Sequence, residues 1–249
     1  MNLILDIGNT NAKLAVFNGE EIIHSETVSY SNLMLVLNSY LRKFDITKSI
    51  LSNVGADIEG LEAFLKEHFY FIKLNSKTKL PISINYETPE TLGVDRIALA
   101  VASFHKSKRE NSLVIDMGSC ITYDFISSKG EYQGGAISPG LNMRFKSMHN
   151  FTESLPLVTI RESQSIIGKN TEMSLVNGVM HGITAEIDSY IDTLTEEFGK
   201  ISVFICGGDH PFFVKKLKNS IFADQKILLR GLNIILNYNF ENRNEDITF

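Results

Sequence analysis

Two stretches of the sequence are nearly alike, Asn2-Leu3-Ile4-Leu5-Asp6-Ile7-Gly8-Asn9-Thr10 and Ser112-Leu113-Val114-Ile115-Asp116-Met117-Gly118-Ser119-Cys120. Each begins with an apolar run that predicts a buried strand, and continues with an acid, a glycine and small residues. A strand that ends in Asp-x-Gly and a tight turn places a carboxylate beside exposed backbone N–H groups. Such N–H groups bind anions, and the acid can hold Mg²⁺ through its water shell. The repeat therefore predicts a duplicated domain with one phosphate-binding turn in each copy.

The composition is that of a globular protein and excludes several classes of partner. The chain has 249 residues, of which 43% are hydrophobic and 21% charged. The net charge of −5, without a dense Lys/Arg cluster, argues against nucleic acid or an anionic membrane as the main partner. We expect no transmembrane helix and no signal peptide. Cys120 and Cys206 each lie next to a strand-like run, and we expect reduced thiols and a cytoplasmic location.

Strands and helices are predicted to alternate along the chain. Apolar runs and turn residues predict strands at residues 2–5, 12–17, 21–28, 49–53, 71–74, 112–115, 121–126 and 201–206. Apolar spacing of three and four predicts helices after a Ser31 cap and over residues 60–69, 91–106, 173–198 and about 232–238. The polar stretch 106–112 is the best boundary, which divides the chain into expected halves at residues 1–108 and 109–249.

This order of elements resembles a known α/β fold. Three strands in a meander, followed by helix, strand and helix, form the plan of the ribonuclease-H-like fold. Its duplication resembles the acetate and sugar kinase/Hsp70/actin superfamily, in which nucleotide binds between the two halves. The resemblance concerns the fold and by itself fixes no substrate.

Further motifs follow the first turn in a characteristic order. They are Tyr86-x-x-Pro89-x-x-Leu92-Gly93-Val94-Asp95-Arg96, Gly134-Gly135-x-Ile137-x-Pro139-Gly140, Leu155-Pro156, Ile167-Gly168-Lys169-Asn170-Thr171 and Gly207-Gly208-Asp209. Together with Asp6-x-Gly8-Asn9-Thr10, they resemble the type III pantothenate kinases, also described as Bvg accessory factor homologues. The similarity extends from residue 2 to about residues 229–232. Each motif is weak alone, but their order and spacing are specific.

The resemblance implies ATP-dependent phosphorylation of the primary hydroxyl of pantothenate to 4′-phosphopantothenate, the first step of coenzyme A biosynthesis. It assigns the role of proton acceptor to Asp95. Phosphoryl transfer requires alignment, charge neutralisation and a carboxylate that orients the hydroxyl, so an acid in this motif suits the role. Taken alone, Asp95 would be read as a first-turn helix acid that pairs locally with Arg96.

The same resemblance implies which residues contact ATP and cations. Asp6 would act on Mg²⁺ through water, and Lys13 would reach a phosphate, although a solvated strand lysine would look the same. Asp116 would bind a monovalent cation, K⁺ or NH₄⁺; without the repeat it would be read as an acid that caps a turn. The residues implied in ATP binding are Asp6, Ile7, Gly8, Asn9, Thr10, Asn11, Ala12, Lys13 and Ser119.

Pantothenate would be held by Tyr86, Gly93, Val94, Asp95, Arg96 and Thr171. The planar guanidinium of Arg96 suits the substrate carboxylate. The aromatic ring of Tyr86 would equally suit a place in the core. The family further implies a homodimer.

One turn departs from the family pattern, and two other functions stay open. Most members have Asp-x-Gly-Thr-Ala-x-Thr, whereas this chain has Asp116-Met117-Gly118-Ser119-Cys120-Ile121-Thr122. Serine keeps the hydroxyl and cysteine is a small apolar replacement, so we expect the ATP contacts to persist. The alternatives are a kinase of the same superfamily for a sugar or another small alcohol, and a nucleotide-binding regulatory protein.

Overall fold

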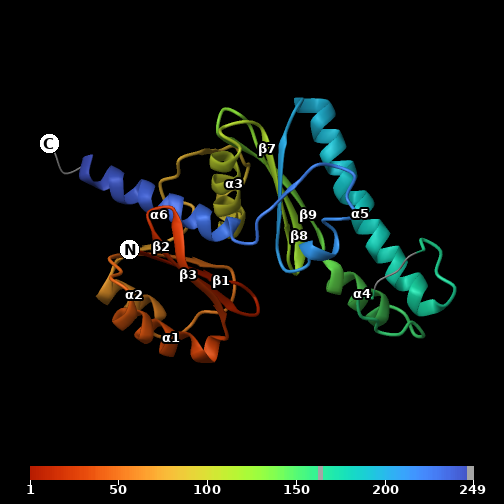
Figure 1. Cartoon of the computed structure of the whole chain (residues 1–249), viewed down its shortest axis with the longest axis horizontal. Helices are drawn as coiled ribbons and strands as arrows, with labels where there is room; N and C mark the ends of the chain where they lie inside the picture. Colours follow the sequence, from red (N-terminus) through yellow and green to blue (C-terminus); the bar gives the residue numbers. More distant parts are fainter. Residues whose placement is uncertain (162–164, 246–249) are drawn as a thin grey trace.

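The computed structural model describes residues 1–161 and 165–245, and within them the chain forms two mixed sheets with helices between and around them (Figure 1). The first sheet has the strand order β3-β2-β1-β4-β5. Strands β1, β2 and β3 form an antiparallel meander, and β4 and β5 run parallel to β1. These strands are β1 (Asn2–Ile7), β2 (Ala12–Asn18), β3 (Glu21–Val28), β4 (Lys48–Asn53) and β5 (Tyr70–Lys73).

The second sheet repeats this plan. Its order β9-β8-β7-β10-β11 has the same meander and the same two parallel strands, and the short β6 (Ser83–Ile84) is added beside β9. The strands are β7 (Ser112–Met117), β8 (Cys120–Ile126), β9 (Glu131–Pro139), β10 (Ser202–Cys206) and β11 (Phe222–Ala223). The prediction of a duplicated α/β fold is therefore confirmed.

Three layers of helices cover the faces of the two sheets. Helices α1 (Tyr30–Lys43) and α2 (Leu61–His68) pack on the outer face of the first sheet, and α4 (Leu141–Asn150) and α5 (Thr171–Phe198) on that of the second. Helices α3 (Val94–Lys106) and α6 (Ile227–Glu245) lie between the sheets and pack on each other (Figure 1). Two 3₁₀ turns cover Pro89–Thr91 and His210–Phe212.

The alternation of side chains along each central strand explains this arrangement. Leu3 and Leu5 of β1 face α1 and α2, whereas Ile4 faces the α3–α6 layer. In β7, Leu113 faces α5 and Val114 faces the shared layer. Strands that are apolar on both faces have to be covered on both sides, which is why the two apolar runs quoted first lie at the centres of their sheets.

Several predicted boundaries were wrong. Helix α1 begins at Tyr30 after Ser29, so Ser31 is not its cap. Residues 89–91 form a 3₁₀ turn and α3 begins only at Val94, because the extended Leu92 and Gly93 separate the two. Helix α5 begins at Thr171, where the Asn170 side chain accepts the N–H of Met173 at 2.8 Å.

The expected division at residue 108 remains a prediction. One element on each side of it packs on, or pairs in, the sheet formed by the other half. Strand β6 belongs to the second sheet, and α6 contacts β1, β2 and β4 of the first. Within residues 1–161 and 165–245, no helix is both long enough and apolar enough to span a bilayer. Cys120 and Cys206 are free thiols, as predicted.

Candidate active site

The first predicted turn begins at Asp6, near the end of β1. In the sheet Asp6 lies opposite Lys13 of β2 and Ser52 of β4. The Ser52 hydroxyl donates to Asp6 Oδ1 at 3.1 Å, and Lys13 Nζ lies 3.9 Å from Oδ2. Burial raises the pKa of Asp6 to about 6, although Lys13 and Ser52 act to lower it. The carboxylate is therefore ionised at neutral pH at a cost that a nearby cation would reduce.

The turn itself presents small polar side chains to solvent. Asn9, Thr10 and Asn11 are exposed, and the N–H of Gly8 donates to the Asn11 carbonyl at 3.2 Å. Ile7 and Ala12 are fully buried, so these two members of the predicted ATP-binding stretch can contact a ligand only through their backbone.

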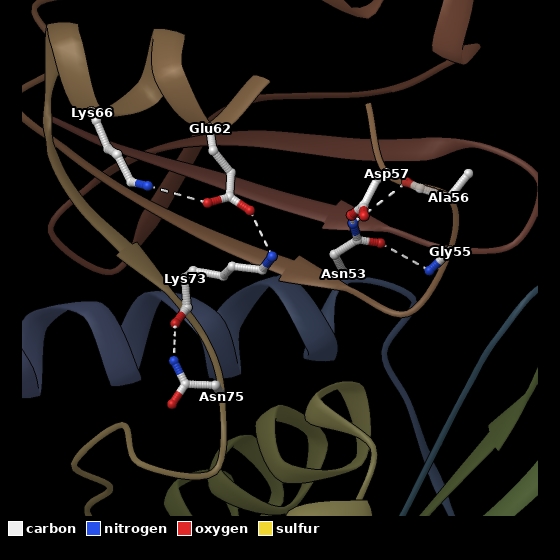
Figure 2. A network of polar contacts seen from close by, with 8 residues as sticks. All are labelled: Asn53, Gly55, Ala56, Asp57, Glu62, Lys66, Lys73 and Asn75. Carbon is white, nitrogen blue, oxygen red and sulfur yellow. Dashed lines mark hydrogen bonds and ion pairs between the residues drawn. The ribbon is translucent and has the colours of Figure 1, made fainter. Parts of the chain in front are cut away.

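A loop after β4 supports this turn from behind. Gly55 packs so closely that a Cβ on it would lie 2.1 Å from the Gly8 carbonyl oxygen, and the Tyr30 hydroxyl donates to the same oxygen. Figure 2 shows how Asn53 fixes the loop: its Oδ1 accepts the N–H of Gly55 at 2.9 Å and its amide reaches the Ala56 carbonyl at 3.4 Å. Gly55 was not predicted as a site residue, because no motif surrounds it.

The second turn is likewise closed by backbone hydrogen bonds but is one residue shorter, since Met117 pairs with Ile121 where Ile7 pairs with Ala12. The N–H of Gly118 donates to the Cys120 carbonyl at 3.0 Å, and that of Gly140 to the Ser119 carbonyl at 3.2 Å. Gly207 follows β10 as Gly55 follows β4, and a Cβ on it would lie 2.4 Å from Asp116 Oδ1. Its φ of +88° also favours glycine. The Gly207-Gly208-Asp209 motif is thus the support of the second turn.

The acids of the two turns and Asp95 act on one another. Burial raises the pKa of Asp116; the charge of Lys13 lowers it and that of Asp95 raises it. Asp95 and Asp116 likewise raise the pKa of Asp6. Carboxylates from β1, β7 and α3, with the amine of Lys13, therefore share one electrostatic environment at the junction of the halves.

Asp95 does not form the local ion pair with Arg96 that it would form as an ordinary helix acid. Its Oδ1 accepts the backbone N–H of Arg96 at 2.8 Å, while the Arg96 guanidinium pairs with Asp124 of β8. A Cβ on Gly93 would lie 2.5 Å from Asp95 Oδ1, so a larger residue there would displace the Asp95 carboxylate. Val94 is the first residue of α3. Asp95 is half-buried and keeps part of its surface open for a substrate.

Tyr86 lies beside the same group of residues. Its ring centroid is 6.0 Å from that of Tyr132, and a hydrogen bond with Tyr86 contributes to the raised pKa of Arg96. Tyr86 is only half-buried, so its hydroxyl is not confined to core packing.

One cleft joins the two turns. Thr10 of the first turn and Ser119 of the second both line a space of about 630 Å³, and Asn142 and Lys146 of α4 contribute another wall. Helix α4 and Asp209 were not predicted to line a nucleotide site. Thr171 lines an adjoining hollow of about 470 Å³ that shares Ser147 with this cleft. Thr171 is not among the residues that line the cleft with Thr10 and Ser119.

No set of three or more His, Cys, Asp and Glu side chains within residues 1–161 and 165–245 is arranged to enclose a metal ion. A cation at this site would therefore take part of its coordination from water, nucleotide phosphates or backbone carbonyls. Burial makes the ionised form of Asp6 and of Asp116 costly, as the raised pKa of each shows, and a bound cation would lower that cost.

Comparison with known proteins decides the family. The sequence profile of the family described as type III pantothenate kinase matches residues 2–193. The chain belongs to the type III pantothenate kinase family. A type III pantothenate kinase of Bacteroides fragilis strain YCH46 is 45% identical over 243 residues, which cover 96% of this chain and 98% of the relative. Another from Christiangramia forsetii is 42% identical over 240 residues, with 96% and 99% covered.

Solved structures agree with this fold. A Campylobacter jejuni protein described as a Baf family transcriptional activator has a TM-score of 0.61 at 26% identity, covering 97% of this chain and 99% of its own. An inorganic polyphosphate/ATP-glucomannokinase from Arthrobacter sp. strain KM has a TM-score of 0.50 at 13% identity, with 96% and 99% covered. This type III pantothenate kinase family member therefore has the fold of the sugar kinase superfamily, as its duplicated sequence predicted.

Proposed function

We propose that this protein phosphorylates pantothenate with Mg-ATP to give 4′-phosphopantothenate, the first step of coenzyme A biosynthesis. Membership of the type III pantothenate kinase family supports the choice of substrate. The observation that supports phosphoryl transfer is that Asp95 of α3, Asp6 of β1 and Asp116 of β7 share one electrostatic environment where the two halves meet.

Asp95 is the proposed proton acceptor for the primary hydroxyl. A half-buried carboxylate at the first turn of α3 can orient a hydroxyl and receive its proton as the bond to phosphorus forms. Thr10 and Ser119 line the cleft that would hold ATP, and the exposed Asn9 and Asn11 lie in the same turn as Thr10. Lys13 would contact a phosphate as a point charge.

Two cations complete the proposed site. Mg²⁺, held by Asp6 through water, would neutralise charge on the ATP phosphates. A monovalent cation, K⁺ or NH₄⁺, would be held by Asp116, whose carboxylate the Gly207 loop packs against. Both roles are proposals that rest on the family resemblance and on the raised pKa of each acid.

The substrate would lie against Tyr86, Gly93, Val94 and Arg96, with its carboxylate near the Arg96 guanidinium. Thr171 would also contact pantothenate, and we propose a homodimer, both because the family resemblance implies them. The free thiols of Cys120 and Cys206 agree with the proposed cytoplasmic location.

The test is ADP release by the purified protein with Mg-ATP and K⁺, with pantothenate compared against sugars and small alcohols. We expect turnover with pantothenate alone, and a loss in kcat of about 10²- to 10⁴-fold in Asp95→Asn without loss of ATP binding. The matched control is Asp45→Asn, an exposed acid remote in sequence from both turns, which should retain activity.

Two outcomes would favour the alternatives. Turnover with a sugar in place of pantothenate would make the protein another kinase of the superfamily. ATP binding without turnover of any substrate would favour a nucleotide-binding regulator, in line with the description of the Campylobacter jejuni structure.

A further inference from the structure

A buried polar cluster lies directly behind Arg96. Asp124, in the middle of β8, is 0% exposed and Arg96 is 6% exposed. Arg96 Nε donates to Asp124 Oδ1 at 2.8 Å, and Nη2 lies 2.8 Å from the same oxygen. The Tyr132 hydroxyl of β9 also donates to Oδ1, at 2.8 Å. A single carboxylate oxygen of the second sheet thus holds a side chain of α3.

Two buried polar atoms of this cluster lack a hydrogen-bond partner within the described part of the chain. Among the described residues, Arg96 Nη2 and Asp124 Oδ2 are buried without a hydrogen-bond partner of good geometry. An ion pair removed from water and left partly unsatisfied adds little stability, and apolar residues of similar volume often stabilise a core equally well. Folding alone therefore does not account for this ion pair in the core.

Both groups are charged at neutral pH. Burial raises the pKa of Asp124 to about 6, while Arg96 and the Tyr132 hydroxyl lower it. Burial acts to lower the pKa of Arg96, but Asp124, Tyr132 and Tyr86 together offset this and the net pKa is raised. The ion pair consequently persists at pH 7 and above.

Arg96 follows Asp95, the proposed proton acceptor, at the start of α3. A residue that holds the Arg96 guanidinium therefore also sets its position relative to Asp95. A guanidinium has five N–H groups in a rigid fork, of which Asp124 engages the Nε–Nη2 edge and Tyr86 makes one further hydrogen bond. A free arginine side chain would lose rotamer freedom on binding a carboxylate. Because Asp124 already orders the Arg96 side chain in the folded protein, this loss does not occur when substrate binds.

We propose that Asp124 is a positioning residue for substrate binding: it holds Arg96 so that the remaining N–H groups face the carboxylate of an acidic substrate. Tyr132 supports it by holding Asp124. The inference rests on the proposed function, because it takes the carboxylate of pantothenate as the group that Arg96 binds.

The experiment compares two substrates in Asp124→Asn, Tyr132→Phe and the wild type: pantothenate, and the neutral alcohol in which its carboxylate is reduced to CH₂OH. We expect Asp124→Asn to lower kcat/KM for pantothenate about 10- to 100-fold, mainly through KM. The KM for ATP and kcat/KM for the neutral alcohol should change less than about threefold. Tyr132→Phe, which keeps the carboxylate, should shift the preference in the same direction by a smaller factor, and provides the comparison if Asp124→Asn does not fold.

The control is Asp188→Asn. Asp188 is a buried carboxylate of α5 that accepts the Lys218 N–H at 3.2 Å and the Asn219 amide at 2.9 Å, away from the cleft. It should lose stability without changing the preference for the acid over the alcohol. Equal losses for both substrates in Asp124→Asn and in Tyr132→Phe would overturn the inference alone, because the wild type would still phosphorylate pantothenate. A wild type that fails to phosphorylate pantothenate would overturn the proposed function and the inference with it.

Discussion

At the scale of single residues, Lys13 is the cation that acts on both turns. It lies 3.9 Å from Asp6 and lowers the pKa of Asp116 as well. We expect Lys13→Met to raise the KM for ATP about tenfold or more, because an interaction between a charged donor and a phosphate contributes about 1.5–3 kcal/mol. The measurement is initial rate against ATP concentration at saturating pantothenate.

Lys66→Met is the matched control for Lys13→Met. Lys66 pairs with Glu62 on the surface of α2 at 3.3 Å (Figure 2), and exposed pairs of this kind contribute little. Its KM for ATP should stay within about twofold of the wild type. An unchanged KM for ATP in Lys13→Met would contradict the phosphate contact and mean that Lys13 is an ordinary solvated strand lysine.

The buried Asp124 should make stability depend on pH. Its pKa of about 6 in the folded protein exceeds the ordinary value of 3.8, so the folded state binds the proton more tightly between these two values. Lowering the pH from 7.5 to 5.5 should therefore raise the free energy of unfolding through this group by on the order of 1 kcal/mol. The groups that face it are Arg96 of α3, which stays charged, and Tyr132 of β9, whose pKa is raised.

Urea unfolding at both pH values, in the wild type and in Asp124→Asn, measures this contribution. On acidification from pH 7.5 to 5.5, the free energy of unfolding should rise by about 1 kcal/mol more in the wild type than in Asp124→Asn. This difference is the contribution of Asp124. Equal gains would show that Asp124 does not titrate in this range. Other acids with a raised pKa, such as Asp6, cancel in the comparison.

The convergence of residues was predictable where a motif surrounded them and not elsewhere. Asp6, Asp95 and Asp116 each follow or precede a glycine at a recognisable spacing, and the structure brings their charges together. Asp124 lies inside an ordinary strand, and only the pairing of β8 with the α3 layer makes it a partner of Arg96. Such long-range pairings leave no local trace in the sequence.

At the scale of elements, the close approach of α6 to α3 depends on one glycine. A Cβ on Gly231 would lie 1.9 Å from the Ala98 carbonyl oxygen of α3. Gly231→Ala should destabilise the protein by about 1–3 kcal/mol or more, since the helices have to move apart. Ala98 is less than one helical turn from Asp95, so kcat should fall as well. Chemical denaturation and steady-state kinetics measure the two effects.

Gly178→Ala in α5 is the matched control for Gly231→Ala. A Cβ at that position meets no atom within 4 Å. Alanine should therefore stabilise the helix by about 0.5–1 kcal/mol through its greater helix propensity. If Gly231→Ala were stabilising to the same extent, the tight contact between α3 and α6 would be wrong.

Elements were predictable in proportion to the apolar surface that they bury. Helix α5 buries a long stripe of apolar residues from Leu175 to Ile191, and the spacing of these residues by three and four predicted the helix. Helix α4 buries only Leu141 and Phe145, so too few apolar positions repeat for a period to be recognised, and it was missed. Strands β6 and β11 have two residues each and depend wholly on their neighbours for pairing.

At the scale of the whole molecule, the repeat predicted the duplication correctly but not how far the halves depend on each other. The two sheets have the same order and directions. Yet α3 and α6 together form the layer between them, and one core cluster contains residues of both sheets and both helices. Duplicated sequences describe the plan of each half, whereas the shared layer arises only when the halves meet.

This shared layer predicts that residues 1–108 do not fold alone. Without α6, the inner face of the first sheet would expose Ile4, Ala15, Phe17 and Ile50, all fully buried in the intact chain. We expect the isolated fragment to lack a cooperative unfolding transition in circular dichroism, because it cannot bury enough apolar surface to offset its conformational entropy. Co-expression with residues 109–249 should restore a complex that unfolds cooperatively and binds ATP, since α6 then covers the first sheet again. A sharp transition from fragment 1–108 alone would mean that α1, α2 and α3 suffice to stabilise the first sheet, and that α6 serves only to connect the two halves.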